Sequence, residues 1–563
     1  MLTPMRCSQF LQIGKRFTSV GRTVENSFHW LAEHYNSMLA GALKRRRLVV
    51  IGSGIIFLAS LLFIRILRKE FIPPQDQSMF LCSLQTPVGS SIEFTDERFH
   101  QAEAFVMSRP ELARYFAAIG GFAGGEVNRG IIFATFKAPK KRPIVPPNTH
   151  PLSQKELMAL FRKELNKIPN LKAYIQDLSL SGFSAQRGFP IELTVRGPDW
   201  EKLASFASSI QKRMAESNLM VDVDTDYLSG ASEIQVFPDR EKAAQRGVSI
   251  ATIGQTINSL IGGERVAKYT HGGKRYDVRI RLIPSQRTQT QDIEQLWVWN
   301  NRGEMVQLKD VVTITEKPTA LTITRRGRER AITVFANVAP GKSQADAIAE
   351  AEHIAKEVLP EGYRAVLSGS AQTFRESFKS LTFVFWLGIL VAYMVLGSQF
   401  NSFVHPFTVL VALPFSISGA LVALWLGGQS INIYSMIGII LLMGIVKKNS
   451  ILLIDFTNQL REQGLNVQES LLKACPIRLR PILMTSTATI TAAIPPALAL
   501  GPGAEIRIPM AIAVIGGVII STLFTLFVVP CVYSLMVKFE RKKIEPPSLT
   551  NEKFIDNNLN VRI

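Results

Sequence analysis

Four polar side chains lie inside one long apolar run and are the residues most able to carry chemistry. Residues 431–456 (INIYSMIGIILLMGIVKKNSILLIDF) are long enough to cross a membrane as one helix, and they contain Lys447, Lys448, Asn449 and Asp455. An ionisable group at that depth costs about 3 kcal/mol on insertion scales, so such groups are retained mainly for function. The spacing of Lys448 and Asp455 places them on one helical face, about 10 Å apart along the axis. A buried amine that responds to neighbouring carboxylates is the chemistry of a proton relay.

A simpler interpretation is that Lys447 and Lys448 reach the cytoplasmic interface from the end of a shorter helix. Only residues 431–446 would then cross the membrane, fewer than the roughly 20 residues required. The apolar residues 451–454 would also be left outside. We therefore expect Lys448 to lie within the membrane.

Hydroxyl groups on a second apolar segment are candidate acceptors for this amine. Residues 481–500 contain Thr485 and Ser486, and hydroxyls in a membrane helix can bond to a polar group on a neighbouring helix. The alternative is a bond to a carbonyl of their own helix. Asp455 is too distant along the helix to contact Lys448 directly, and the sequence holds no other intramembrane carboxylate. The sequence therefore contains the lysine of the predicted relay but lacks the carboxylates that would act on it.

Apolar runs of near-spanning length recur along the 563 residues and explain a hydrophobic content of 47%. They are residues 48–64, 381–397, 406–426, 431–456, 481–500 and 508–537. Six crossings predict a membrane α-helical bundle of six transmembrane helices, one over residues 48–67 and five within residues 376–540. A basic amphipathic lead (residues 1–47) and a polar, disordered tail (residues 541–563) are expected in the cytoplasm.

The net charge of +19 does not indicate nucleic-acid binding, because the basic clusters flank the apolar runs. That position follows the positive-inside rule, and it places the long segment after the first helix outside the cytoplasm. The four cysteines form no CxxC pair and the seven histidines are scattered, so we expect no internal disulfide, metal cluster, cofactor or hydrolytic site.

The outer segment shows four strand–helix–strand units, from the switch between period 2 and period 3.6. Paired βαβ units predict two ferredoxin-like subdomains, the first over residues 68–186 and the second over residues 187–229 and 326–375. An insertion at residues 230–325, with its own strand, helix and hairpin pattern, divides the second. We interpret it as a partner-docking module, the alternative being a structural elaboration only.

Three aromatic residues bracket the glycine-rich stretch 120–125 in the first subdomain. They are Phe116, Phe122 and Phe133. Aromatic side chains at strand ends beside a flexible loop suit a cleft for an apolar ligand. The alternative is that they belong to the core of the subdomain.

Several segments together carry a family resemblance. They are residues 70–77 (EFIPPQDQ), 239–249 (DREKAAQRGVS), 339–343 (APGKS), 444–455 (GIVKKNSILLID) and 478–486 (RLRPILMTS). In this order they resemble the C-terminal half of a resistance–nodulation–division (RND) efflux transporter of the hydrophobe/amphiphile multidrug-exporting type. The resemblance extends over residues 1–540.

The resemblance implies a multi-pass protein of the bacterial inner membrane with a large periplasmic domain, acting as a proton antiporter rather than as an enzyme. Lys448 would be the relay lysine, with Asn449 and Asp455 beside it. Arg478, Thr485 and Ser486 would be its partners on the next helix. Small hydrophobic substrates would enter the cleft between the subdomains, lined by Phe116, Phe122 and Phe133. The insertion would meet a periplasmic adaptor protein and an outer-membrane channel, in a homotrimer.

One departure from the family is large. Its members carry an aspartate pair on a helix of the N-terminal half, which has no counterpart here. Transport would therefore require a separate N-terminal half. The alternatives are an inactive remnant, a membrane-anchored scaffold whose periplasmic region binds partners, and an RND relative for lipid or protein export.

Overall fold

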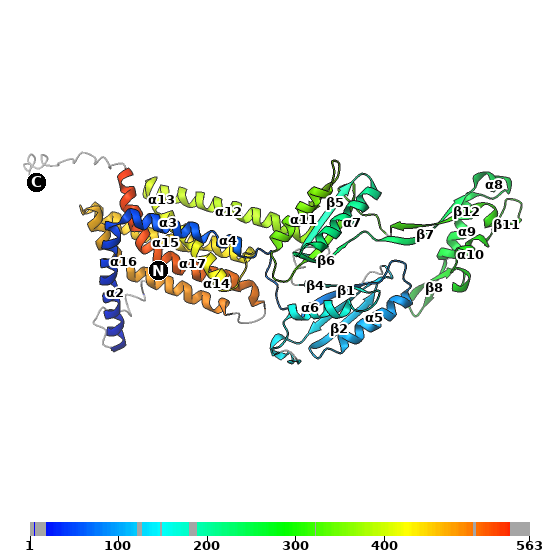
Figure 1. Cartoon of the computed structure of the whole chain (residues 1–563), viewed down its shortest axis with the longest axis horizontal. Helices are drawn as coiled ribbons and strands as arrows, with labels where there is room; N and C mark the ends of the chain where they lie inside the picture. The colour runs from blue at the N-terminus through cyan, green and yellow to red at the C-terminus, as the bar shows by residue number, and fades with distance from the viewer. Residues whose placement is uncertain are drawn as a thin grey trace, which may run out of the picture.

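The computed structural model describes Met5 and residues 19–120, 126–146, 149–178, 189–320, 322–498 and 503–540. The molecule is elongated, with a helical bundle at one end, two sheet-and-helix subdomains in the middle and a slender insertion at the far end (Figure 1). Phe122 and the tail at residues 541–563 lie outside the described residues.

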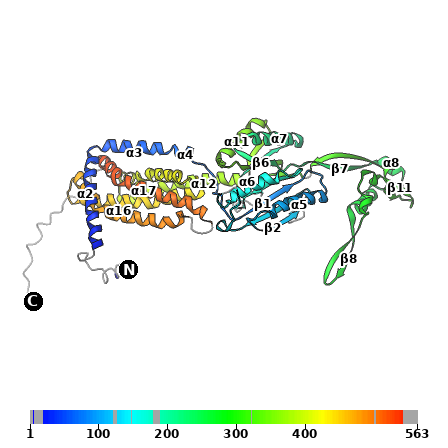
Figure 2. The same ribbon diagram turned by 60° about the horizontal axis from the view of Figure 1, so that its bottom comes forward.

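The bundle is built from long helices that run side by side. They are α3 (Arg46–Ser60) with α4 (Phe63–Ile66), α12 (Gly369–Phe400), α13 (Val404–Leu410) with α14 (Ala412–Leu426), α15 (Ile433–Glu462), α16 (Val467–Ala497) and α17 (Ala504–Met536), followed by the short η6 (Val537–Phe539). Within the part of the chain that the structure describes, five helical segments are long and apolar enough to cross a membrane. The more polar α16 lies beside them (Figure 2).

Helix α17 is the centre of the bundle and packs against α14, α15 and α16. Small residues permit this approach, because a Cβ added at Gly516 would lie 2.6 Å from the carbonyl oxygen of Gly419 on α14. On the α15 side, a Cβ at Gly438 would meet the carbonyl oxygen of Met510 at 3.0 Å. Close backbone packing through glycine is the usual way that membrane helices associate.

A short turn joins α15 to α16, since α15 continues past its apolar run to Glu462 and α16 begins at Val467 and runs without a break into the next apolar segment. Gly464, with φ +91°, supplies the left-handed turn between them. Asn466 then caps α16 together with Glu469 in a capping box.

Helix α2 (Ser19–Lys44) crosses one end of the bundle at a steep angle (Figure 1). The Tyr35 hydroxyl donates a 2.6 Å hydrogen bond to the carbonyl oxygen of Leu526 on α17. The guanidinium of Arg480 on α16 lies 5.4 Å from the centre of the Phe28 ring. The lead is thus attached to α16 and α17.

The first sheet-and-helix subdomain contains a four-stranded antiparallel sheet in the order β2–β3–β1–β4. In chain order its elements are β1 (Met79–Gln85), α5 (Ile92–Met107), β2 (Leu112–Ile119), β3 (Arg129–Phe136), η1 (Pro139–Lys141), α6 (Gln154–Leu165) and β4 (Lys172–Gln176). Burial alternates along β1 and β3, so one face of the sheet packs on α5 and α6. Phe80 and Phe161 meet edge to face in this core, with ring centres 5.0 Å apart.

The second subdomain repeats this arrangement, with strand order β15–β5–β14–β6 and the short β13 also paired to β14. Its elements are β5 (Ile191–Gly197), α7 (Trp200–Glu216), β6 (Met220–Thr225), β13 (Arg325–Arg326), β14 (Glu329–Val338), α11 (Gln344–Val358) and β15 (Arg364–Leu367). Helix α12 begins directly after β15 and continues into the bundle.

The insertion leaves and re-enters between β6 and β14 through a ribbon of β7 (Ser229–Pro238) and β12 (Val312–Ala320). Beyond it lie α8 (Arg240–Gln245), α9 (Ile250–Ile257), η3 (Asn258–Gly263), β8 (Glu264–His271), β9 (Lys274–Ile280), η4 (Pro284–Gln286), α10 (Thr290–Glu294), β10 (Trp297–Trp299), β11 (Met305–Gln307) and η5 (Leu308–Asp310). A small core that includes Val298, Leu308 and Val311 makes it a separate folding unit. The β8–β9 ribbon projects away from it (Figure 2).

Polar contacts join the two subdomains. Arg162 on α6 donates hydrogen bonds of 2.8 and 2.9 Å to Asp222 on β6, and the Tyr174 hydroxyl donates to Asp224. Asp222 has φ +55°, a left-handed conformation that is rare for a residue with a side chain. The two subdomains have separate apolar cores, so these contacts determine how the sheets sit against each other.

Arg142 stabilises the entry to the first sheet, and its substitution by methionine tests this. Its buried guanidinium donates to both carboxylate oxygens of Asp76, at 2.6 and 2.7 Å, and to the carbonyl oxygen of Leu152 at 2.7 Å. Arg142→Met leaves that carboxylate uncompensated, so we expect a loss of about 3 kcal/mol, measured by amide hydrogen exchange of β1 in the full chain. Arg364→Met, which removes an exposed pair with Glu329, is the control and should cost below about 1 kcal/mol.

The same pair gives a pH dependence. Burial raises the pKa of Asp76, but hydrogen bonds from Arg142 and from the Gln154 amide outweigh it and hold that pKa below its usual value. The stabilisation is therefore present above the unfolded pKa of about 3.9 and is lost as pH falls through the folded value. The hydrogen-exchange protection of β1 should therefore fall as the pH is lowered, and it should fall less in Arg142→Met than in the parent chain. An equal fall in both would contradict this account.

Candidate functional site

Helix α15 positions the central candidate residues. Asn432 caps its first turn with a side chain that accepts from the Ser435 amide at 3.0 Å, and the helix then continues to Glu462. Asn449 is buried towards α16 and α17, whereas Lys448 beside it is exposed in this chain. Helix α15 thus directs the Asn449 amide towards α16 and α17 and holds the Lys448 amine at the edge of that helix contact.

A hydrogen-bond network centred on Asn449 joins three helices. Its amide nitrogen donates to the Ser486 hydroxyl on α16 at 3.3 Å, and the Thr485 hydroxyl lies 3.5 Å from its amide oxygen. Ser486 continues the network to Thr522 on α17 at 2.9 Å. Thr485 also donates to the carbonyl oxygen of Ile482 in its own helix at 3.1 Å. Both arrangements considered for these hydroxyls therefore occur, one across helices and one within α16.

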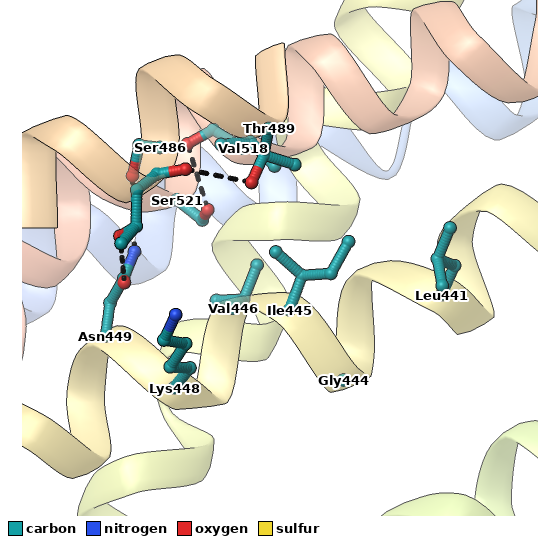
Figure 3. Close-up of a pocket in the computed structure, with 11 residues that line it drawn as sticks. Leu441, Gly444, Ile445, Val446, Lys448, Asn449, Ser486, Thr489, Val518 and Ser521 are labelled. Atoms are coloured by element: carbon teal, nitrogen blue, oxygen red, sulfur yellow. Dashed lines mark hydrogen bonds between the residues drawn. The ribbon is translucent and has the colours of Figure 1, made fainter. Parts of the chain in front are cut away.

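A cavity of about 300 Å³ borders this network. It is lined by Leu441, Gly444, Ile445, Val446, Lys448, Asn449, Thr485, Ser486, Thr489, Val518 and Ser521. The Lys448 side chain extends from α15 into the same space as Asn449 (Figure 3). Among the described residues, Lys448 has no hydrogen-bond or ion-pair partner. The site can therefore hold an amine beside hydroxyl and amide acceptors, and lacks a counter-charge within the described chain.

Two other predicted residues are not brought to this cavity. Asp455 is exposed on α15 and accepts a 2.9 Å hydrogen bond from Gln459 of the same helix. The Arg478 guanidinium lies over the Phe456 ring, 4.3 Å from its centre, and its Nε is buried without a hydrogen-bond partner among the described residues. Arg478 thus joins α16 to α15 through a ring contact near the end of the bundle.

Sequence reasoning missed the contribution of α17. Thr522 completes the network and Ser521 lines the cavity, while the hydroxyls of Ser450 and Thr525 are buried without a partner in the described chain. The signal was present in the hydroxyl residues within the apolar segment 508–537. Their periodicity alone could not show which helix they face.

The aromatic candidates of the first subdomain lie on the sheet. Phe116 and Phe133 are direct cross-strand partners on β2 and β3. Both lie on the face opposite α5 and α6, outside the buried core, and Phe116 is 50% exposed. The structure therefore brings these two rings together on an accessible face, and the place of Phe122 beside them stays a prediction.

Comparison with known proteins gives a consistent family match. The model of the AcrB/AcrD/AcrF family matches residues 1–537. The chain is 29% identical to multidrug resistance protein MdtC of Escherichia coli strain UTI89 over 557 residues, which are 96% of this chain and 52% of that protein. MdtC of strain E2348/69 matches with the same identity and coverage. The chain spans about half the length of these relatives.

A similar fold occurs in solved structures of a heavy metal efflux pump. Two crystal forms superpose with TM-scores of 0.81 and 0.80, each covering 91% of this chain and 52% of the other. The sequence identity is 24% in both cases, so this likeness concerns the fold alone.

Removal of the Asn449 side chain tests whether the network stabilises the bundle. Asn449→Ala loses the bonds to Thr485 and Ser486, and an interhelical hydrogen bond in a membrane protein is worth about 1 kcal/mol. We expect a lower thermal unfolding midpoint in detergent. Thr487→Ala, at an exposed position of the facing helix α16, is the control. Equal shifts for both variants would assign no special role to Asn449.

Proposed function

The chain belongs to the AcrB/AcrD/AcrF family of RND efflux transporters, and from that membership we propose that it acts as the C-terminal half of a proton-driven exporter of apolar and amphiphilic compounds. In this proposal it is a secondary active transporter of the inner membrane. A second set of helices, equivalent to the other half of the relatives' length, completes the transporter. The five apolar segments would each cross the membrane, and in this proposal α16 supplies a sixth crossing beside them.

The single observation that carries the proposal is the Lys448 amine, which has no partner in the part of the chain that the structure describes. Lys448 shares one stripe of α15 with Ile437, Leu441, Gly444 and Asp455, and all five are exposed in this chain. A charged group on a membrane helix faces the bundle interior or a water-filled cavity rather than lipid. A further set of helices must therefore cover this stripe. A carboxylate on those helices would give Lys448 its counter-charge.

The proposed coupling follows from this arrangement. While the opposing carboxylates are ionised, they hold the Lys448 ammonium beside Asn449. Their protonation removes the attraction, and the amine turns to the acceptors on α16, such as Thr485. Because Asn449 and Ser486 connect α15, α16 and α17, a change at the amine shifts these helices together. Only a state-dependent contact of this kind can bias a conformational equilibrium.

The periplasmic side supplies the path for substrate. We interpret both sheets as ferredoxin-like subdomains, on the support of their shared strand order. Phe116 and Phe133 present aromatic surface on the open face of the first sheet, where an apolar compound would be held. The projecting insertion is suited to meet an adaptor protein and an outer-membrane channel, in a homotrimer.

Complementation tests the half-transporter proposal. In a host that lacks its own pumps, the chain together with a matching N-terminal half should lower drug susceptibility, and Lys448→Ala should abolish the effect. Lys447→Ala is the control, because Lys447 does not line the cavity. Rescue by this chain alone would overturn the requirement for a second half. No rescue with any partner half would favour a scaffold or an inactive remnant.

Loss of an exposed ring tests the substrate path. With the N-terminal half supplied, Phe116→Ala should raise KM for apolar substrates about tenfold, since burial of one aromatic ring contributes about 1.5–3 kcal/mol. Phe237→Ala, at a ring of similar exposure (51%) in the insertion, is the control. An unchanged KM in Phe116→Ala would remove the first sheet from the substrate path.

A further inference from the structure

A short segment between the first membrane helix and the first sheet touches helix α15. Residues 68–71, the linking segment, pair with the residue that precedes the α15 cap. The Ile431 amide donates to the Arg68 carbonyl oxygen at 2.8 Å, and the Glu70 amide donates to the Ile431 carbonyl oxygen at 3.1 Å. Lys69 and Ile431 form a parallel β-bridge. The segment is thus fixed to the N-terminal end of the helix that carries Lys448.

Two further hydrogen bonds, one between side chains and one between backbone groups, reinforce this attachment. The Ser430 hydroxyl donates to the Glu70 carboxylate, and the Ile433 amide donates to the Phe71 carbonyl oxygen at 3.3 Å. Asn432, which caps α15, is fully buried at this place. Because Ser430, Ile431 and Asn432 are buried, a movement of α15 along or about its axis must either carry the linking segment with it or leave buried groups unpaired.

The other edge of the same segment is bonded to the first turn of α11 in the second subdomain. The Ala345 amide donates to the Lys69 carbonyl oxygen at 3.2 Å, and the Lys69 amide donates to the Ser343 hydroxyl at 3.3 Å. The Phe71 amide donates to the Gln344 side-chain oxygen at 2.9 Å, while the Gln344 side-chain nitrogen donates to the Pro190 carbonyl oxygen at 2.9 Å. Gln344 therefore joins the linking segment, α11 and the start of β5.

We propose that the linking segment transmits movement of α15 to the second subdomain, and that Gln344 and Ser343 are positioning residues for transport. The proposal rests on the proposed function for its role in export, but the mechanical connection stands on the contacts above. Helix α12 is a second, covalent connection between this subdomain and the bundle. Loss of the hydrogen-bonded link would therefore leave the subdomain attached and folded, while its position no longer follows α15.

The first subdomain contains a matched control. Ser153 caps α6 and is followed by Gln154, just as Ser343 caps α11 and is followed by Gln344. Gln154 is also buried, and its side chain accepts from the Met79 amide at 3.4 Å and donates to Asp177 at 3.0 Å. Both bonds stay within the first subdomain. Replacement of either glutamine by methionine removes a similar pair of hydrogen bonds and keeps a similar side-chain volume. Only Gln344→Met removes a bond to the linking segment, the one from the Phe71 amide.

The test measures the distance between nitroxide labels on α11 and α15 in the full chain in detergent. Exposed positions suited to the labels are Ala349 on α11 and Ile437 on α15, each replaced by cysteine. Cys82, Cys475 and Cys531 are buried and escape labelling, and Cys7 is replaced by serine. We expect a narrow distance distribution in the labelled parent, a broadened and shifted one in Gln344→Met, and a parent-like one in Gln154→Met. A parent-like distribution in Gln344→Met would overturn the proposal.

Export assays with the N-terminal half present supply the functional readout. We expect Gln344→Met to lower the maximal export rate about fivefold or more with KM unchanged, since loss of coupling acts on turnover rather than on substrate binding. An unchanged rate in Gln344→Met beside an active parent would overturn the role in transport. If the parent exports nothing while the label distances respond as expected, the mechanical link stands and the proposed function fails.

Discussion

The structure depends on satisfying polar groups inside an apolar bundle. Asn449 is buried on α15, and its amide group is bonded to Ser486 and Thr485 on α16, while Ser486 is bonded in turn to Thr522 on α17. An unpaired amide in an apolar surrounding would cost several kcal/mol, so this network fixes the register of three helices. Lys448, one residue earlier, is a charged group that has no hydrogen-bond or ion-pair partner among the described residues.

The network can hold that register because the helices approach closely. Gly419 and Gly516 let α14 meet α17 backbone to backbone, and Gly438 does the same for α15. Close packing of this kind transmits small displacements from one helix to the next. At its N-terminal end α15 is bonded to the linking segment, which is bonded in turn to α11. The polar site and the second subdomain are thus ends of one hydrogen-bonded path.

The two sheet-and-helix subdomains are connected to the bundle in different ways. Two subdomains with separate apolar cores meet through polar contacts such as Arg162 with Asp222, and an interface of that kind permits relative movement more readily than a shared core. The second subdomain is attached to the bundle by α12 and by the linking segment. The contacts with Asp222 and Asp224 on β6 then connect the first subdomain to the second.

The sequence by itself determined the elements. The patterns of period 2 and period 3.6 predicted two pairs of strand–helix–strand units, which the structure contains, and the apolar runs predicted the long helices of the bundle, because local periodicity records which face is buried. It also singled out Lys448, Asn449, Thr485 and Ser486 by residue type. Only the tertiary structure decided that Arg478 and Asp455 lie away from the cavity and that α16 continues through its prolines. It also decided that Thr522 bonds to Ser486 and that Gln344 bonds to the linking segment. These depend on contacts between residues distant in the chain, and a local pattern does not encode which neighbour a side chain will meet.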